Sequence, residues 1–251
     1  MAGRVVIISG GGTGIGLATA RRFARDGDTP VLIGRRPDVL ERAAGSLPGA
    51  VALPADLADP ADATRVAQAV AERFGTVDVL VNNAGGNGLL EPRPPDGTAG
   101  PVAEAAHDWT TAFRINTLTA VLLTEALRDR LASPGGRVLF LSSIAAYRGS
   151  GSGTYAAAKA ALHPYVHDLA RQLGPRGVTV NAVAPGYVEE TEFFGSGMPP
   201  ERRDARVAET LNGRPGTPGD VAETLHWLAS HAAGHLTSQI LQVNGGAERG
   251  H

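Results

Sequence analysis

The 251-residue chain contains no cysteine. This absence excludes disulfide bonds, cysteine-ligated zinc, iron–sulfur clusters and thiol nucleophiles. Lysine is almost as scarce, because Lys159 is the only lysine among 23 lysine and arginine residues. It follows Ala158, which excludes a Walker A loop, where the residue before the lysine is glycine.

The sequence also lacks long hydrophobic runs and any excess of positive charge. No apolar run approaches the roughly 20 residues that span a bilayer. The run at residues 5–8 is too short for the core of a signal peptide. A net charge of −2 does not favour binding to nucleic acid or to a membrane surface. We therefore expect a cytoplasmic protein that binds neither.

Short, continuous apolar runs, rich in β-branched residues, recur along the chain. Such runs predict strands covered on both faces, as in a parallel sheet. The predicted strands are 4–9, 30–34, 50–54, 77–81, 137–141, 178–183 and 239–243, and the predicted helices are 14–26, 37–46, 60–74, 104–132, 153–174 and 218–231. This alternation predicts a single α/β domain over residues 1–251, a doubly wound, Rossmann-like parallel sheet of about seven strands with helices on both faces.

Two stretches are too long and irregular for simple turns, and such loops are usually functional. We expect residues 86–103 to line the entrance of a site. Residues 186–216 contain four apolar side chains and are predicted to form a lid over the substrate. These side chains are Phe193, Phe194, Met198 and Leu211.

A glycine-rich turn follows the first predicted strand. The spacing G-x-x-x-G-x-G fits Gly10, Gly14 and Gly16, whereas G-x-G-x-x-G fits in no register. Glycine permits a tight turn and close approach of the backbone, and the N-terminus of the following helix attracts a pyrophosphate. The turn therefore predicts a dinucleotide site.

A series of motifs in a fixed order resembles the short-chain dehydrogenase/reductase family, in particular the 3-oxoacyl-carrier-protein reductases of its short, single-domain branch. The series runs from Ser9 to Gly246. It comprises Ser9-Gly10-x-x-x-Gly14-Ile15-Gly16, Asn82-Asn83-Ala84-Gly85, Asn116, Ser143, Tyr155-x-x-x-Lys159 and Pro185-Gly186. The resemblance implies an oxidoreductase that uses a nicotinamide dinucleotide.

The second predicted strand is followed by Arg35 and Arg36, where an NAD site usually has an acidic residue for the ribose. Arginine suits the 2′-phosphate of NADP, and arginine at position 35 accompanies NADP in the family. We therefore favour NADP over NAD, although both arginines could simply be solvated. The resemblance implies cofactor contacts from Gly10, Gly12, Thr13, Gly14, Ile15, Gly16, Arg35, Arg36, Asp56, Leu57, Asn83, Ala84, Gly85, Tyr155, Lys159, Pro185, Gly186 and Val188. In the family, a threonine that follows the last of these segments also contacts the cofactor. Here that threonine is Thr191, one residue later than in the family pattern.

Tyr155 and Lys159 are four residues apart and share one face of a helix. A free tyrosine has a pKa of ~10, and a neighbouring ammonium would lower it toward neutrality. By resemblance, Tyr155 is the general acid in ketone reduction and the general base in alcohol oxidation. Lys159 lowers its pKa and holds the ribose, and Asn116 positions a water through its carbonyl.

A serine is expected to polarise the substrate carbonyl. Alignment of the fifth predicted strand with the family selects Ser143. Counting back from Tyr155 by the family's commonest separation of serine and tyrosine selects Ser142 instead. We favour Ser143.

These residues predict reduction by NADPH of a ketone, either a 3-oxoacyl thioester or a small secondary-metabolite carbonyl. The alternatives are an NAD-dependent alcohol dehydrogenase working oxidatively and a non-catalytic dinucleotide sensor. The family's enoyl reductases have a wider spacing of tyrosine and lysine, which argues against reduction of a carbon–carbon double bond. The family forms homodimers and homotetramers, although Pro164 should kink the helix that usually packs between subunits. We expect no metal, because His163 and His167 lack a third ligand.

Overall fold

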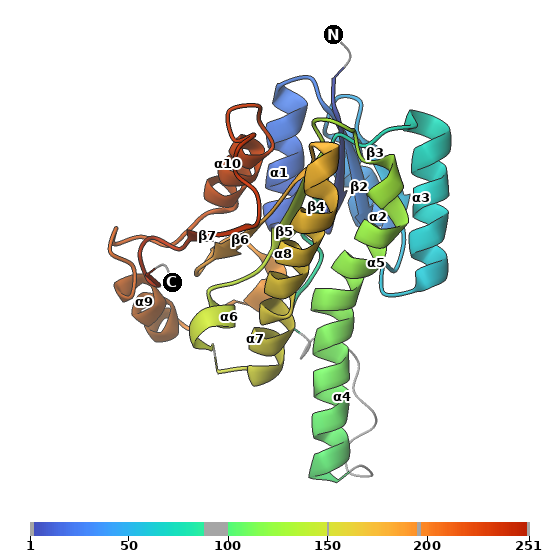
Figure 1. Cartoon of the computed structure of the whole chain (residues 1–251). Coiled ribbons are helices and arrows are strands. Elements are labelled where there is room, and N and C mark those ends of the chain that lie inside the picture. The colour runs from blue at the N-terminus through green and yellow to red at the C-terminus, as the bar shows by residue number, and fades with distance from the viewer. Residues whose placement is uncertain (1–2, 88–99, 150, 195–196, 250–251) are drawn as a thin grey trace.

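The computed structural model describes residues 3–87, 100–149, 151–194 and 197–249 (Figure 1). Seven strands form one parallel sheet in the order β3-β2-β1-β4-β5-β6-β7. The strands are β1 (Val5–Ser9), β2 (Thr29–Gly34), β3 (Val51–Pro54), β4 (Val79–Asn82), β5 (Arg137–Leu141), β6 (Thr179–Pro185) and β7 (Gln239–Val243). The predicted doubly wound sheet is therefore confirmed.

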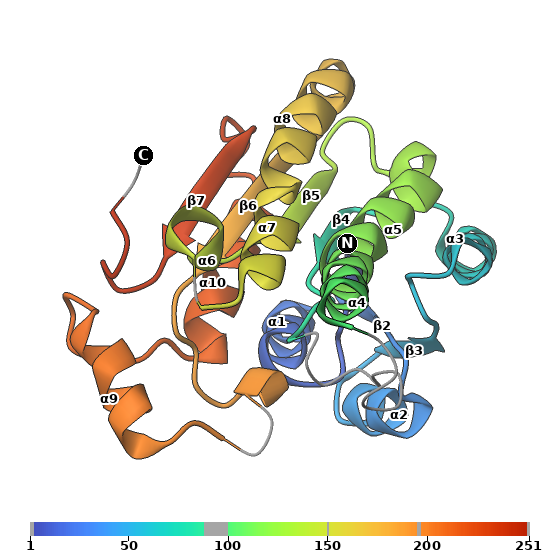
Figure 2. The ribbon, with the colours of Figure 1, turned by 90° about the horizontal axis from the view of Figure 1, so that it is seen from below.

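Two layers of helices cover the sheet (Figure 2). One face packs against α1 (Gly14–Arg25), α2 (Pro37–Gly45) and α10 (Pro218–Leu228). The other packs against α3 (Pro60–Phe74), α5 (Thr119–Leu127) and α8 (Leu162–Leu173).

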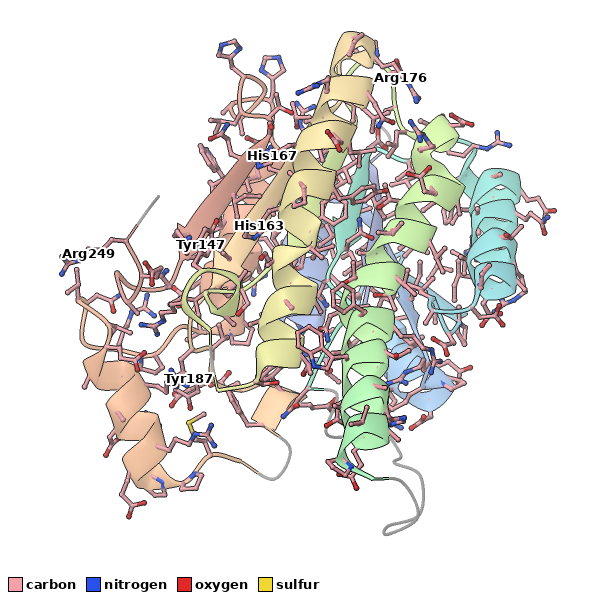
Figure 3. All side chains as sticks on the ribbon, turned by 60° about the horizontal axis from the view of Figure 1, so that its bottom comes forward. Tyr147, His163, His167, Arg176, Tyr187 and Arg249 are labelled. Carbon is pink, nitrogen blue, oxygen red and sulfur yellow. The ribbon has the colours of Figure 1, made fainter. Side chains whose placement is uncertain are left out.

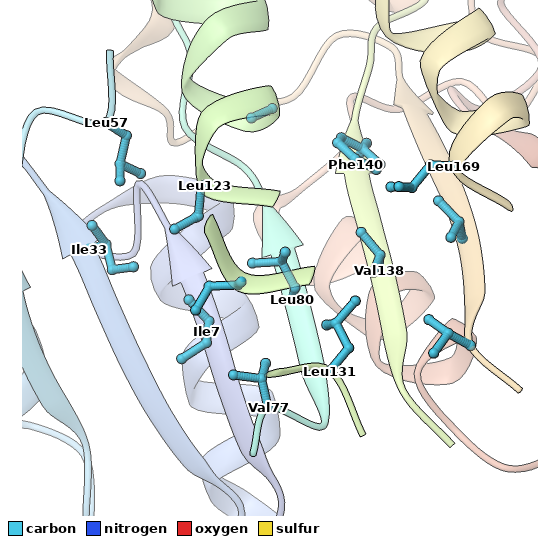
Figure 4. Close-up of a cluster of buried hydrophobic side chains, with 14 of the residues drawn as sticks. Ile7, Ile33, Leu57, Val77, Leu80, Leu123, Leu131, Val138, Phe140 and Leu169 are labelled. Carbon is cyan, nitrogen blue, oxygen red and sulfur yellow. The ribbon is translucent and has the colours of Figure 1, made fainter. Parts of the chain in front are cut away.

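Neighbouring residues of a strand enter different cores. Ile7 and Leu80 point into the core under α3, α5 and α8 (Figure 4), whereas Val6 and Ile8 point into the other. All four are fully or almost fully buried. Because side chains alternate between the faces of a strand, a strand covered on both sides must be apolar throughout. This explains the continuous runs in the sequence.

The remaining helices lie near the carboxyl edge, the edge of the sheet at which the strands end. They are α4 (Pro101–Phe113), α6 (Ala145–Arg148), α7 (Gly153–Ala160) and α9 (Pro200–Ala208), and they gather at the bottom of Figure 1. The order of the strands reverses between β1 and β4, and ligands of such sheets bind in the crevice at this edge.

The predicted helices differ from the structure in four places. Residues 104–132 form α4, a π-helical turn (Arg114–Leu118), α5 and a 3-10 turn (Arg128–Arg130) rather than one helix. Residues 153–174 are divided at Ala161 into α7 and α8. The division lies one turn before Pro164, which has no backbone N–H to continue the helical bonding. The helices α6 and α9 were not predicted.

Candidate active site

The glycine-rich turn links β1 to α1. Gly10 and Gly14 have φ angles of +64° and +50°, which favour glycine. A Cβ on Gly16 would overlap the Gly10 carbonyl, and one on Gly12 would lie 3.0 Å from Val39. Among the described residues, no side chain caps the N-terminus of α1 at Thr13, and its first turn has no acidic residue. Its first backbone N–H groups can therefore receive an anion.

The end of β4 holds this turn in place. Asn83 Nδ2 donates to the carbonyls of Ser9 and Gly10 at 2.9 and 3.2 Å. The backbone N–H groups of Asn83 and Ala84 donate to the Ser9 hydroxyl at 3.0 and 2.9 Å. The motif at residues 82–85 thus aligns the edges of β1 and β4, and Ile15 packs below the turn against a core.

Residues after β2 and β3 lie beside the turn. Arg35 and Arg36 are exposed, and Arg36 Nη2 is 2.6 Å from the carboxylate of Glu192. The Asp56 carboxylate is 2.6 Å from Arg114, while Leu57 is buried. The position directly after β2, at which an acidic residue would favour NAD, is thus occupied by arginine.

The segment after β6 closes the other side of the crevice. A Cβ on Gly186 would lie 2.7 Å from Asn244, and Val188 is buried. The Pro185 carbonyl accepts from the N–H of Ile144 at 2.9 Å, which ties the end of β6 to the segment after β5. The methyl group of Thr191 lies 3.5 Å from the place of a Cβ on Gly14. Thr191 thus faces the turn at Gly14 despite its shifted position in sequence.

Tyr155, on α7, and Ser143 interact through their hydroxyl groups, and this interaction lowers the pKa of the tyrosine. Ser143 Oγ itself accepts from the backbone N–H of Ala145 at 3.1 Å. That bond uses a lone pair and leaves the hydroxyl hydrogen free to be donated toward Tyr155 or a substrate oxygen. The loop after β5 and the helix α7 therefore bring together a hydroxyl donor and a phenol.

Ser142 points elsewhere. Its hydroxyl lies 2.8 Å from His163 Nε2 and 3.3 Å from the Lys159 carbonyl, both on the helices that follow. The structure thus separates the two serines that sequence left as alternatives, because adjacent residues leaving a strand point in different directions.

Lys159 is buried, with 4% of its surface exposed, and its Nζ donates to the Leu141 carbonyl at 2.8 Å. A Cβ on Gly85 would lie 3.0 Å from this nitrogen and 2.6 Å from Asn116 Oδ1. Glycine at 85 therefore lets the backbone after β4, the lysine and the asparagine meet at one point.

Asn116 lies in the π-helical turn and is 1% exposed. Its side-chain nitrogen donates to the carbonyls of Gly86 and Ala112, and its oxygen accepts from the N–H of Gly86. A π-helical turn shifts the backbone bonding, and the bond from Asn116 gives the Ala112 carbonyl a side-chain partner. Such turns are frequent at functional sites.

The electrostatics of the pair differ from the sequence-based expectation. Burial raises the pKa of Tyr155 to about 12, and the bond from Ser143 offsets this only in part. Burial also lowers the pKa of Lys159 to about 8. Desolvation of the phenolate thus outweighs the expected stabilisation by the ammonium, and Tyr155 is protonated at neutral pH.

An aromatic cluster from the segment after β6 covers Tyr155. The Phe193 ring meets Tyr155 edge-on, with centroids 5.0 Å apart, and Phe194 contacts both Phe193 and Tyr187. Tyr187 lies on the side of the molecule that carries α9 (Figure 3). Leu211, predicted to belong to the lid, is 72% exposed, and Met198 is half-buried. Most of the predicted entrance loop, residues 88–99, lies outside the described residues.

His163 and His167 do not come together with further metal ligands. His163 contacts Ser142 and the ring of Tyr147, beside which it lies in Figure 3, and His167 contacts Ser238. Burial and the charge of His167 lower the pKa of His163. In the described part of the chain, no group of three or more His, Asp or Glu residues could hold a metal ion.

Comparison with known proteins adds independent evidence. Residues 10–248 match a family model described as enoyl-(acyl carrier protein) reductase. The chain is 33% identical to the short-chain reductase protein NovJ of Streptomyces niveus, covering 96% of this chain and 93% of that protein. It is 30% identical to the 3-oxoacyl-[acyl-carrier-protein] reductase FabG of Vibrio cholerae, covering 97% of each.

Solved structures agree with these relatives. A short-chain dehydrogenase from Burkholderia cenocepacia, crystallised in complex with NADP, superposes with a TM-score of 0.84 at 30% identity over 98% of both chains. No helix in the described ranges is long and apolar enough to cross a membrane. The chain therefore belongs to the short-chain dehydrogenase/reductase family and is an oxidoreductase.

Proposed function

We propose that this enzyme uses NADPH to reduce a ketone to a secondary alcohol. The observation that carries the proposal is the interaction of the Ser143 hydroxyl with the phenol of Tyr155, which shares the helix α7 with the only lysine of the chain. The substrate is a 3-oxoacyl thioester or a small secondary-metabolite carbonyl compound. The relatives named as a 3-oxoacyl-carrier-protein reductase and a short-chain reductase support this class.

The residues present fit NADP. The uncapped N-terminus of α1 and the glycine backbone suit the pyrophosphate. Arg35 and Arg36 suit a 2′-phosphate. When bound, NADPH would supply the hydride that adds to the carbonyl carbon.

The chain's own residues would supply the proton and the alignment. Ser143 donates a hydrogen bond to the substrate oxygen and so stabilises the negative charge that develops there. Tyr155, protonated at neutral pH, gives its proton to that oxygen, which completes the alcohol. The Lys159 ammonium favours the phenolate that remains, and Asn116 fixes the backbone beside the lysine.

Reduction of a carbon–carbon double bond is less well supported, although the matched family model carries an enoyl reductase name. Tyr155 and Lys159 are separated by three residues on one helix, as in the carbonyl-reducing branch that the sequence resembles. A serine that can donate to an oxygen beside the phenol also suits a carbonyl.

We further propose that residues 186–216 act as the substrate lid of a single catalytic domain, supported by the contact of Phe193 with Tyr155.

We also propose that the protein is cytoplasmic and forms a homodimer or a homotetramer. Two features support self-association: β7 forms an edge of the sheet, where backbone groups remain available, and Trp227 on α10 is 45% exposed.

The cofactor assignment is tested by titrating the protein with NADPH and with NADH while following nicotinamide fluorescence. NADPH should bind more tightly, and a screen of ketones by loss of NADPH absorbance should then find turnover. Arg35→Ala should weaken NADPH binding by about tenfold, because a charge-assisted contact to phosphate is lost, and should leave NADH binding nearly unchanged.

The matched control is Arg42→Ala, which removes an exposed arginine from α2 that pairs with Asp38. It should alter neither affinity. Equal losses for NADPH and NADH in Arg35→Ala, or a preference of the wild type for NADH, would contradict the phosphate role of Arg35.

The reaction should also respond to pH. Lys159 loses its charge above a pKa of about 8, whereas Tyr155 stays protonated up to about 12. The kcat/KM for ketone reduction should therefore be level below pH 7 and fall above pH 8, because the neutral amine no longer stabilises the phenolate. A rate profile from pH 6 to 10 measures this, with circular dichroism as the control for folding. A rate that rises above pH 8 would contradict the prediction.

A further inference from the structure

A carboxylate from the segment after β6 contacts the residues proposed to hold the 2′-phosphate. Glu192 begins the 3-10 turn Glu192–Phe194. Its carboxylate oxygens lie 2.6 and 3.5 Å from the two terminal nitrogens of Arg36, and one lies 3.4 Å from the Thr13 hydroxyl. Sequence reasoning did not single out Glu192, which is separated from Arg36 by 156 residues.

This contact uses the groups that an anionic ligand needs. A guanidinium pairs best with a single planar anion through two parallel bonds, and Glu192 takes that position on Arg36. A phosphate at the same guanidinium would meet a second negative charge at hydrogen-bonding distance. The carboxylate must therefore leave, or the phosphate must bind against its repulsion.

The ion pair is suited to exchange. The side chains of Arg36 and Glu192 are 56% and 60% exposed, and exposed pairs contribute little stability. The turn that carries Glu192 also carries Phe193, which packs on Tyr155. The competing carboxylate is therefore next in sequence to a side chain that contacts Tyr155.

We propose that Glu192 determines cofactor selectivity by competing with the 2′-phosphate of NADP(H) for Arg36 and Thr13. The proposal rests on the proposed function, because it requires NADP(H) at this site. It predicts that the wild-type chain discriminates between NADPH and NADH less strongly than its arginines alone would allow.

Glu192→Gln is the direct test, because it removes the charge and keeps the size of the side chain. Measured by nicotinamide fluorescence at low salt, its Kd for NADPH should fall about two- to fivefold, the scale of an exposed ion pair, while its Kd for NADH stays unchanged. Glu190→Gln is the matched control, because it removes the same charge from an exposed residue of the same segment. It should change neither Kd.

A double-mutant cycle tests whether the effect passes through Arg36. In an Arg36→Ala background, Glu192→Gln should no longer tighten NADPH binding. If Glu192→Gln tightened the binding of NADPH and NADH equally, Glu192 would act on the pyrophosphate or the lid, and its role in selectivity would be overturned. An unchanged Kd for NADPH would also overturn that role. If wild-type NADPH binding is measurable but Glu192→Gln has no effect, this inference fails alone. If no variant binds NADPH, the proposed function fails with it.

Discussion

Replacing Tyr155 with phenylalanine should lower kcat for ketone reduction by about 10²- to 10⁴-fold, the contribution of a positioned general acid. The change removes one oxygen and keeps the ring, so the edge-on contact with Phe193 should persist. Binding of NADPH should change little, because the glycine-rich turn and Arg35 lie on other elements. Steady-state kinetics and a fluorescence titration measure the two effects separately. Retained turnover would contradict the role of Tyr155.

Tyr165→Phe is the matched control for that substitution. Tyr165 lies on α8, its hydroxyl is 2.9 Å from the carboxylate of Glu125, and its ring packs on Phe140. Burial raises its pKa, as it does for Tyr155. A raised pKa alone therefore does not identify an acid catalyst. Tyr165→Phe should keep turnover within a few-fold of wild type, because its hydroxyl donates to Glu125 on α5 and is not paired with Ser143.

The central strands could be predicted because they are covered on both faces, as in β4, β5 and β6, which are buried throughout. Burial on both sides requires an apolar residue at every position, and such a run is visible without knowledge of its partners. The boundaries were less accurate, as in β4, which was predicted at 77–81 and spans Val79–Asn82. The glycine-rich turn was equally visible, because a positive φ angle at Gly10 and Gly14 restricts the residue type locally.

The π-helical turn could not be predicted in the same way. Residues 104–132 have the composition of one helix, yet the turn at Arg114–Leu118 interrupts it. Its stabilising contacts run from Asn116 to Gly86, 30 residues earlier. A contact between distant segments leaves no periodic signal in sequence, so Asn116 could be selected only through family resemblance.

Electrostatic environments were also beyond the sequence. The motif of Tyr155 and Lys159 suggested a lowered tyrosine pKa, but burial raises it. The residues that lie against the pair, Phe193 beside Tyr155 and Gly85 beside Lys159, are remote in sequence. The pair of Arg36 and Glu192 is of the same kind, because each residue alone looks like a solvated surface charge. Residue types can be read locally, whereas burial and pairing depend on the finished fold.

The two serines after β5 offer the sharpest test of position within the site. Ser143→Ala should lower kcat for ketone reduction by about 10²- to 10³-fold, as expected for loss of one donor to a developing negative charge. The alanine leaves the N–H of Ala145 without its acceptor and Tyr155 without its hydroxyl partner. Because both losses occur beside the reacting oxygen, KM should change less than kcat.

Ser142→Ala is the matched control, since it removes the same atom from the neighbouring residue. Its hydroxyl contacts His163 and the Lys159 carbonyl, so its loss should cost about 1 kcal/mol of the free energy of unfolding and change kcat by no more than a few-fold. Kinetics and thermal unfolding of both variants separate the two roles. If Ser142→Ala had the larger effect on kcat, the hydroxyl that hydrogen-bonds to the substrate oxygen would belong to the serine that faces His163, and the contact of Ser143 with Tyr155 would be structural.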